Sequence, residues 1–289
     1  MKLQQKIIYL IYYFLEPILQ LFGENQCLIC KNENKYAYFN NINNYTSAKN
    51  IQADQILSKN QYFRLRICSK CIVDIENMIH NFNRCKVCSY PLNKEERCSK
   101  FHHSSFVSNY SLLPLQENLY NLYLEAKYKK NSIALNFFIT LVKTYFAFNT
   151  KDIKDEVNLK HNDYFNYSIK DKIDIITFVP ISLQKKYVRN YNPSQKFAQI
   201  ISKQLNKPLI KCFKETGFSY RHIDRDKSSA TEFANRFSLL QKSKKIIENK
   251  KILLVDDIYT TGKTVAYLSD LLNLNGSNNI YIFTLFRNT

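Results

Sequence analysis

The chain of 289 residues contains no tryptophan, and its 24 acidic residues are far outnumbered by 42 lysines and arginines. The missing tryptophan, together with 21 tyrosines and many asparagines, fits the codon bias of an AT-rich genome. The shortage of acidic residues leaves a formal net charge of +18, which favours a polyanionic partner, either nucleic acid or an anionic membrane surface. The same codon bias also enriches lysine, so composition alone leaves both explanations of the charge open.

A long apolar run and a secretory leader are also missing. The apolar stretch from Ile7 to Leu15 is too short to span a bilayer, and it is followed by Glu16 and Pro17 in place of a small-residue cleavage site. We therefore expect a cytoplasmic protein with reduced cysteines and no transmembrane span. Residues 5–22 favour an apolar, aromatic helix, which either packs on the neighbouring cysteine-rich module or makes peripheral contact with the inner face of the membrane.

Seven of the eight cysteines lie between positions 27 and 98, and six of them form three C-x-x-C knuckles. Each knuckle supplies two ligands with the bite that tetrahedral zinc requires, and with one histidine there are eight ligands for two structural zinc sites. A crossed arrangement, in which the second and third knuckles share one ion, is equally allowed by the spacing. The eighth cysteine, Cys212, is predicted to be a core residue. The most direct assignment is Cys27, Cys30, Cys68 and Cys71 for one site and Cys85, Cys88, Cys98 and His102 for the other.

Alternating apolar strands and amphipathic helices follow the cysteine-rich module and predict an α/β domain with a parallel, doubly wound sheet. We expect two domains, an N-terminal helix with the zinc module over residues 1–103 and the α/β domain over residues 104–289. The predicted strands are 104–110, 173–179, 208–213, 252–257 and 280–286, and the predicted helices are 117–130, 132–148, 193–205 and 262–274.

The stretch from Lys251 to Val265 carries the chemistry. Four apolar residues are followed by Asp256 and Asp257, then by a loop rich in hydroxyl groups and a helix. Ligands bind beyond the carboxyl ends of strands in an open parallel sheet, where two adjacent carboxylates can accept hydrogen bonds from a vicinal diol or hold magnesium through water. The loop enters a helix N-terminus, whose N–H groups suit a phosphate monoester, and Gly262 allows close approach of the backbone. A diol beside a phosphate describes a ribose 5-phosphate.

The same run resembles the 5-phosphoribosyl-1-pyrophosphate (PRPP) signature of the type I phosphoribosyltransferases. The resemblance implies a sheet of that type and PRPP bound with magnesium, with Asp256 and Asp257 on the ribose hydroxyls and the segment from Thr260 to Thr264 on the 5-phosphate. The motif supplies no nucleophile, so turnover stays open. Should it occur, a nitrogen nucleophile would displace pyrophosphate from C1 of PRPP. The PRPP-binding residues implied are Asp256, Asp257, Ile258, Tyr259, Thr260, Thr261, Gly262, Lys263 and Thr264.

The order of the parts resembles the ComF family of competence proteins, which join a zinc ribbon to a phosphoribosyltransferase-type domain. The residues that carry it are the knuckles, Val179-Pro180, the segment Arg189-Asn190-Tyr191-Asn192 and the PRPP run. The resemblance implies that Arg189 is a catalytic-site cation for the pyrophosphate, beside Asp256 and Asp257. It also implies that segment 219–237 is a mobile flap. The chain departs from the family at Asn190, where glycine is usual, and at Cys98, where a fourth C-x-x-C is common, whereas Ser89 is at a position where the family has glycine or serine.

Three hypotheses about function follow. In the first, implied by the resemblance, the protein is a competence factor that binds single-stranded DNA and PRPP, with DNA-uptake helicase or channel proteins as partners. In the second, it is a nucleobase-salvage phosphoribosyltransferase that transfers ribose 5-phosphate from PRPP to a nitrogen acceptor. In the third, it is a zinc-ribbon protein whose PRPP motif senses nucleotide supply.

Overall fold

The computed structural model describes residues 26–32, 67–80, 83–93, 97–129, 131–147, 169–215 and 236–289. The chain divides into two compact units, residues 1–72 and 73–289, and the division falls within α3 (Ser69–His80). The second group of predicted zinc ligands therefore belongs to the same unit as the sheet. The helix predicted at 5–22 and most of the predicted flap lie outside the described residues, and the domain boundary at 103/104 stays a prediction.

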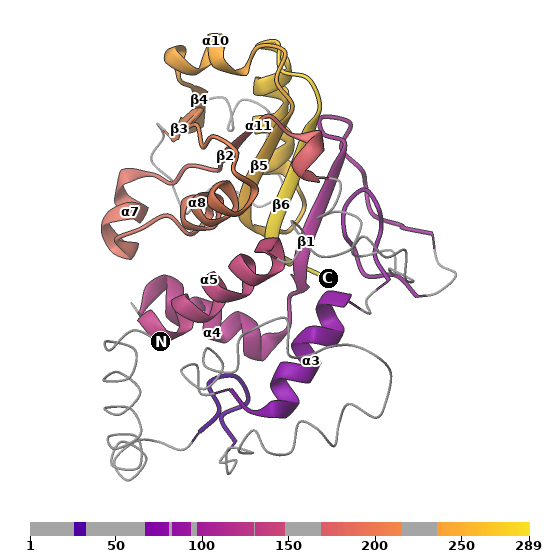
Figure 1. Ribbon diagram of the computed structural model, residues 1–289, viewed down its shortest axis with the longest axis vertical. Coiled ribbons are helices and arrows are strands. Elements are labelled where there is room, and N and C mark those ends of the chain that lie inside the picture. Colours follow the sequence, from indigo (N-terminus) through magenta and orange to yellow (C-terminus); the bar gives the residue numbers. More distant parts are fainter. Residues whose placement is uncertain are drawn as a thin grey trace, which may run out of the picture. The chain divides into compact units, whose positions relative to one another are not determined.

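The larger unit is built on a four-stranded sheet in the order β1-β6-β5-β2 (Figure 1). Every neighbouring pair is parallel, which confirms the predicted parallel α/β sheet. A separate two-stranded antiparallel ribbon pairs β3 with β4. The strands are β1 (Ser108–Pro114), β2 (Ile175–Phe178), β3 (Phe213–Glu215), β4 (Phe237–Leu239), β5 (Ile252–Tyr259) and β6 (Ile280–Arg287).

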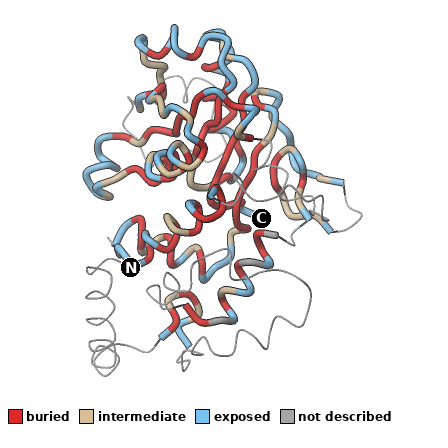
Figure 2. The backbone as a smooth tube through the Cα atoms, viewed as in Figure 1, coloured by how far each residue is buried: buried red, intermediate tan, exposed pale blue. Residues whose placement is uncertain are grey.

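The central strands are buried on both faces, as Figure 2 shows. Leu254 of β5 lies in one core cluster with Val265 and Leu268 of α11 (Lys263–Asn273). On β6, the ring of Phe283 packs against Phe146 of α5 (Ser132–Ala147), with the ring centroids 5.0 Å apart. Helices cover the sheet because an uninterrupted apolar strand exposes hydrophobic side chains on each of its faces.

The predicted helices are present with nearly the predicted bounds. They are α4 (Glu117–Tyr128), α5, α8 (Pro193–Leu205) and α11. The side chain of Asn192 accepts a hydrogen bond from the N–H of Ser194 at 3.0 Å, which confirms the predicted N-cap with Pro193 at the first helical position. Short helical segments at Gln241–Ser243 and Lys244–Ile247 precede β5. Among the residues that the structure describes, no helix combines the length and hydropathy that a membrane crossing requires.

Three elements differ from the sequence-based expectation. The first strand runs from Ser108 to Pro114 and not from 104 to 110. The sheet thus includes the fully buried pair Leu112 and Leu113, which the predicted strand left out. The strand predicted at 208–213 is wrong, since Leu209 makes a single bridge to β2 and the chain then turns to pair β3 with β4. Helix α7 (Leu183–Arg189) is not among the predicted helices; it has no buried residue, so apolar periodicity could not reveal it.

The acid pair lies within β5 and not after it. Asp256 pairs with Thr284 of β6, whereas β2 ends earlier, with Phe178 opposite Val255. The two carboxylates therefore stand where β5 extends past its shorter neighbour. This confirms that they lie at the carboxyl end of the sheet, and the short length of β2 is what opens the edge beside them.

Candidate functional site

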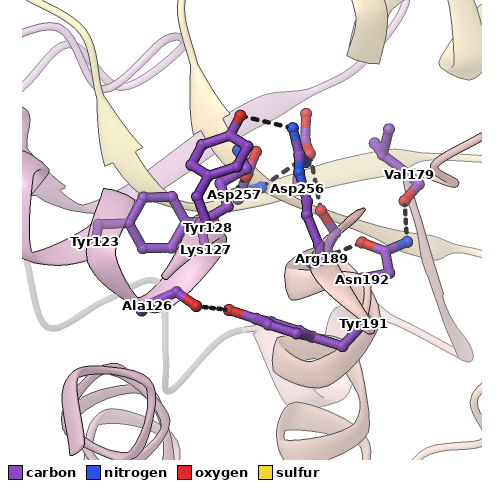
Figure 3. Close-up of polar contacts among 11 residues, drawn as sticks. Tyr123, Ala126, Lys127, Tyr128, Val179, Arg189, Tyr191, Asn192, Asp256 and Asp257 are labelled. Carbon is purple, nitrogen blue, oxygen red and sulfur yellow. Dashed lines mark hydrogen bonds and ion pairs between the residues drawn. The ribbon is translucent and has the colours of Figure 1, made fainter. Parts of the chain in front are cut away.

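Asp257 is held by two side chains of α4 (Figure 3). Its Oδ2 atom accepts hydrogen bonds from the hydroxyl of Tyr123 at 2.7 Å and from Nζ of Lys127 at 2.5 Å. The side chains of Lys127 and Asp257 are only 10% and 16% exposed. Burial acts to raise the pKa of Asp257, but the charge of Lys127 and both hydrogen bonds outweigh it and hold this pKa below its usual value. Asp257 is therefore ionised at neutral pH.

Asp256 has a different environment. Its Oδ1 atom accepts hydrogen bonds from the hydroxyl of Ser194 at 3.0 Å and from the main-chain N–H of Asp257 at 2.8 Å. Burial and then the negative charge of Asp257 raise the pKa of Asp256 to about 7. The two pKa values of this split pair therefore differ. Asp257 stays charged at neutral pH, whereas Asp256 gains or loses a proton near neutral pH.

The sequence-based reasoning missed Tyr123, Lys127 and Ser194 as residues of this site. A signal was present for Lys127, because the apolar stripe of α4 runs through Leu119, Leu122 and Ala126 and places this lysine on the buried side of the helix. A buried lysine requires a partner of opposite charge, and the helical pattern does not show which one.

Arg189, at the end of α7, lies beside the acid pair. Its guanidinium donates to the hydroxyl of Tyr128 at 2.7 Å and stands 4.8 Å from the centre of that ring (Figure 3). Its positive charge also contributes to the lowered pKa of Asp257. The next residue, Asn190, has φ = 63°, a left-handed conformation in which glycine is favoured and asparagine is tolerated. The structure thus accounts for the departure from glycine at this position.

The predicted phosphate loop connects β5 to α11. Thr260, Thr261 and Lys263 are exposed, while Tyr259 at the end of β5 is buried. Gly262 has φ = 79°, and a Cβ atom there would lie 2.2 Å from the hydroxyl oxygen of Tyr259. Only glycine fits this turn, which brings exposed threonine hydroxyls next to the N-terminus of a helix.

The cysteines form the two groups of the direct assignment. In each group the potential ligand atoms all lie within 4.8 Å of one another, and the crossed arrangement is not formed. Sγ atoms are 3.8 Å apart in the pair Cys30 and Cys68 and 3.7 Å apart in the pair Cys88 and Cys98. Tetrahedral zinc with 2.3 Å bonds to sulfur requires sulfur atoms about 3.8 Å apart, so both groups fit zinc. The first cluster is Cys27, Cys30, Cys68 and Cys71, and the second cluster is Cys85, Cys88, Cys98 and His102.

The first and third knuckles have the same backbone turn. The N–H of Lys31 bonds to the carbonyl of Cys27, and the N–H of Ser89 to that of Cys85, both at 2.9 Å. Lys31 and Ser89 are left-handed, with φ of 60° and 55°. Burial acts to raise the pKa of the Cys27 thiol, but main-chain N–H groups, that of Cys68 first, lower it to about 7. Turns that stabilise a thiolate in this way are suited to metal ligands.

Comparison with known proteins supports this arrangement. The phosphoribosyl transferase domain family matches residues 194–289, which include the acid pair and the phosphate loop. The chain is 25% identical over 124 residues to Competence protein ComFC of Bacillus subtilis (strain 168), covering 43% of this chain and 48% of that protein. The match thus spans about half the length of this curated relative.

Solved structures with the same type of domain are only distantly similar. The allosteric regulatory enzyme of purine biosynthesis is 16% identical, with a TM-score of 0.31 over 53% of this chain and 26% of the other. A hypoxanthine phosphoribosyltransferase from Staphylococcus aureus is also 16% identical, with a TM-score of 0.30 over 50% of this chain and 62% of the other. The phosphoribosyltransferase-like α/β fold, with its N-terminal cysteine clusters, therefore rests on the parallel sheet and the matched domain.

Proposed function

We propose a function from the premise that this chain is a phosphoribosyltransferase-like protein of the ComF family. We infer that it binds PRPP with magnesium and acts on single-stranded DNA as a competence protein in natural transformation. DNA-uptake helicase or channel proteins are the partners that this role implies. The observation that carries the PRPP part is the split acid pair next to the exposed Thr-Gly loop at one end of the sheet.

Each part of PRPP has a matching group. The amides and hydroxyls from Thr260 to Thr264 suit the 5-phosphate, and the guanidinium of Arg189 suits the pyrophosphate. The contacts described above engage one oxygen of each carboxylate, Oδ1 of Asp256 and Oδ2 of Asp257, and we assign the other oxygen of each to a ligand's hydroxyls or to hydrated magnesium. Asp256 and Asp257 would hold hydrated magnesium, which would supply positive charge to the pyrophosphate and favour loss of the Asp256 proton.

Zinc in the two cysteine clusters would have a structural role, because protein ligands fill all four positions of each site. Asp257 is engaged by Lys127 and Tyr123, and Asp256, the carboxyl group with a pKa of about 7, is the one proposed to face the ribose, so neither is assigned as a base for an acceptor. The proposal is therefore for binding of PRPP, and turnover is the distinguishing feature of the alternative, a nucleobase-salvage transferase.

The DNA part is supported by charge and by the surface of α7. The chain carries a net charge of +18, and α7 has no buried residue. Tyr187 is 87% exposed and is preceded by Lys186, whose side chain is also exposed. An exposed aromatic ring offers a face for unpaired bases, and neighbouring cations suit phosphates. We propose α7 as a contact surface for single-stranded DNA.

The test of PRPP binding is a calorimetric titration of the purified chain with PRPP in the presence of magnesium. We expect saturable binding that the double substitution Asp256→Ala with Asp257→Ala abolishes. Asp270→Ala, which removes an exposed carboxylate from α11, is the matched control and should leave the affinity unchanged. Absence of binding by the unmodified chain would refute the proposal.

Two further measurements separate the functions. Release of pyrophosphate from PRPP with one particular nucleobase would establish the salvage transferase. Loss of transformation by the double variant, with DNA binding intact, would show that the pocket serves competence through its ligand and not through charge.

A further inference from the structure

Arg287, the last residue of β6, is a buried cation beneath the phosphate loop. It is 4% exposed, and its guanidinium donates to the main-chain carbonyls of Tyr259 at 3.1 Å, Thr260 at 2.8 Å and Cys88 at 3.0 Å. The rings of Tyr259 and Tyr90 lie 4.7 Å and 5.3 Å from the guanidinium carbon. Its partners among the described residues are carbonyl groups and aromatic rings, so no carboxylate there neutralises its charge.

These contacts join the second cluster to the phosphate loop, within one compact unit. Cys88 is a ligand of the cluster, while Tyr259 and Thr260 lead into the loop. A second connection comes from His103, next to the ligand His102, whose Nε2 atom contacts the carbonyl oxygen of Thr261 at 3.0 Å. The main chain is therefore held at Tyr259 and Thr260 by Arg287, which also contacts Cys88 of the second cluster, and at Thr261 by His103.

The planarity of the peptide bond turns these contacts into a consequence for phosphate binding. In a trans peptide the carbonyl of one residue and the N–H of the next point in opposite directions. Holding the carbonyls of Tyr259 and Thr260 on the guanidinium, and that of Thr261 on His103, thus sets the directions of the next three N–H groups. Those N–H groups belong to Thr260, Thr261 and Gly262. Because they are already oriented before an anion binds, binding costs less conformational entropy.

We propose that Arg287 is a positioning residue for the phosphate loop and that PRPP affinity depends on metal at the second cluster through Arg287 and His103. The inference rests on the proposed PRPP site and adds how that site is kept in a binding geometry. The buried positive charge of Arg287 acts in the same direction, because an anion bound on the loop lies close to it.

The first test compares substitutions of two arginines that both bond to carbonyls. Arg84 donates to the carbonyls of Met78, Ser111 and Leu112 and makes no described contact with the loop, so Arg84→Lys is the matched control. We expect Arg287→Lys, which keeps the charge but cannot reach three carbonyls at once, to weaken PRPP binding about tenfold, as loss of a charge-assisted hydrogen bond would. Thermal denaturation of both variants measures any common loss of stability.

The second test uses cobalt as a spectroscopic probe in place of zinc. With the second cluster loaded with Co²⁺, PRPP should change the visible spectrum of the thiolate-bound cobalt, since coupling between two sites is reciprocal. Cys98→Ser should lose one metal equivalent and weaken PRPP binding. Cys30→Ser, which removes a ligand from the first cluster, should lose one equivalent with the PRPP affinity preserved.

The outcomes are separable from those of the proposed function. If PRPP binds the unmodified chain and binds Arg287→Lys and Cys98→Ser equally well, the positioning role is refuted. If PRPP does not bind at all, the proposed function fails, and hydrogen exchange of amides 260–262 still decides the inference. Faster exchange at these amides in Arg287→Lys and Cys98→Ser, but not in Arg84→Lys, would support it, and unchanged exchange would overturn it.

Discussion

The two carboxylates of the candidate site are sequence neighbours, yet they differ in charge at neutral pH. Lys127 and Tyr123 both act on Asp257, while Asp256 has only neutral donors and faces the charge of its neighbour. Two neighbouring carboxylates in a buried site repel each other when both are charged, so they cannot both ionise at their ordinary pKa. The pair is therefore poised to release one proton when a cation binds.

The raised pKa of Asp256 predicts a dependence of stability on pH. Its value in the folded protein, about 7, exceeds its ordinary value of 3.8, so this group's contribution to stability falls as the pH rises from about 4 to about 7. Asp256→Asn imitates the protonated form, and its side-chain oxygen can still accept from Ser194. At pH 8 we expect a gain of up to about 4 kcal/mol, with a corresponding rise in Tm, because a shift of one pKa unit corresponds to about 1.4 kcal/mol.

At about pH 3.5 the same substitution should leave Tm nearly unchanged, because Asp256 is then mostly protonated in both the folded and the unfolded chain. Thermal denaturation of the ligand-free chain at the two pH values measures the difference. An equal shift at both pH values would show that the effect comes from packing and not from the charge. The variant should also lose PRPP binding, so stability and binding change in opposite directions.

Gly262 and Gly276 form a matched pair for testing the phosphate loop. Both have positive φ, 79° and 83°, but a Cβ at Gly262 would clash with the Tyr259 ring, whereas at Gly276 it would make ordinary contacts with Glu248, the nearest at 3.5 Å. We expect Gly276→Ala to cost about 1–2 kcal/mol through backbone strain alone. Gly262→Ala should cost more and should also weaken PRPP binding, which chemical denaturation and calorimetry would measure. Equal costs and unchanged PRPP affinity would contradict the role of this turn.

At the scale of the elements, the site depends on unequal strand lengths and on a helix distant in sequence. β5 extends beyond β2, so Asp256 and Asp257 lie past the end of that neighbouring strand, and α4 supplies Lys127 to the same place. The predicted flap at 219–237 follows β3 and ends where β4 begins, and these two strands pair with each other. Within this ribbon Glu215 bonds to Arg236 at 2.8 Å and to Lys185 at 3.3 Å. The elements around the acids are thus joined by ion pairs as well as by apolar packing.

Helix α7 offers a test of DNA binding that should not disturb the fold. Lys186→Ala combined with Tyr187→Ala removes a charge and an exposed ring from a helix with no buried residue. We expect about tenfold weaker binding of a fluorescent single-stranded oligonucleotide, because stacking on one ring contributes about 1–3 kcal/mol. Fluorescence anisotropy measures the affinity.

The control for this variant is Lys244→Ala combined with Leu274→Ala, which removes one exposed charge and one exposed apolar side chain elsewhere. It should bind DNA as the unmodified chain does. Equal weakening by the two double variants would show that α7 is not a specific contact and that only the total charge matters.

For the whole molecule, the net charge of +18 predicts that DNA binding depends steeply on salt. Each phosphate contact with a single strand contributes about −0.7 to the slope of log K against log salt concentration. With about six contacts, affinity should fall several hundredfold between about 50 and 200 mM salt. Affinity that does not change over this range would mean that the positive charge reflects codon bias and not a polyanionic partner.

Much of the arrangement follows from patterns within a few residues of one another. The C-x-x-C spacings, the N-cap at Asn192 with Pro193 after it, and the apolar run before Asp256 each report a local conformation, and these predictions hold. Helix α7 and the strand predicted at 208–213 failed for the same reason. Helix α7 has no buried residue, and segment 208–213 makes a single bridge to the sheet, so local apolar periodicity gave no correct signal for either.

The contacts that give the site its chemistry join residues more than a hundred positions apart. Lys127 and Asp257 are separated by 130 positions, and Cys88 and Arg287 by 199. Local pattern therefore predicted the acids, the loop and the cysteine clusters. Folding established the split protonation of the acids and the connection between loop and cluster, because both arise from charges and carbonyls that meet only once the sheet has brought distant segments together.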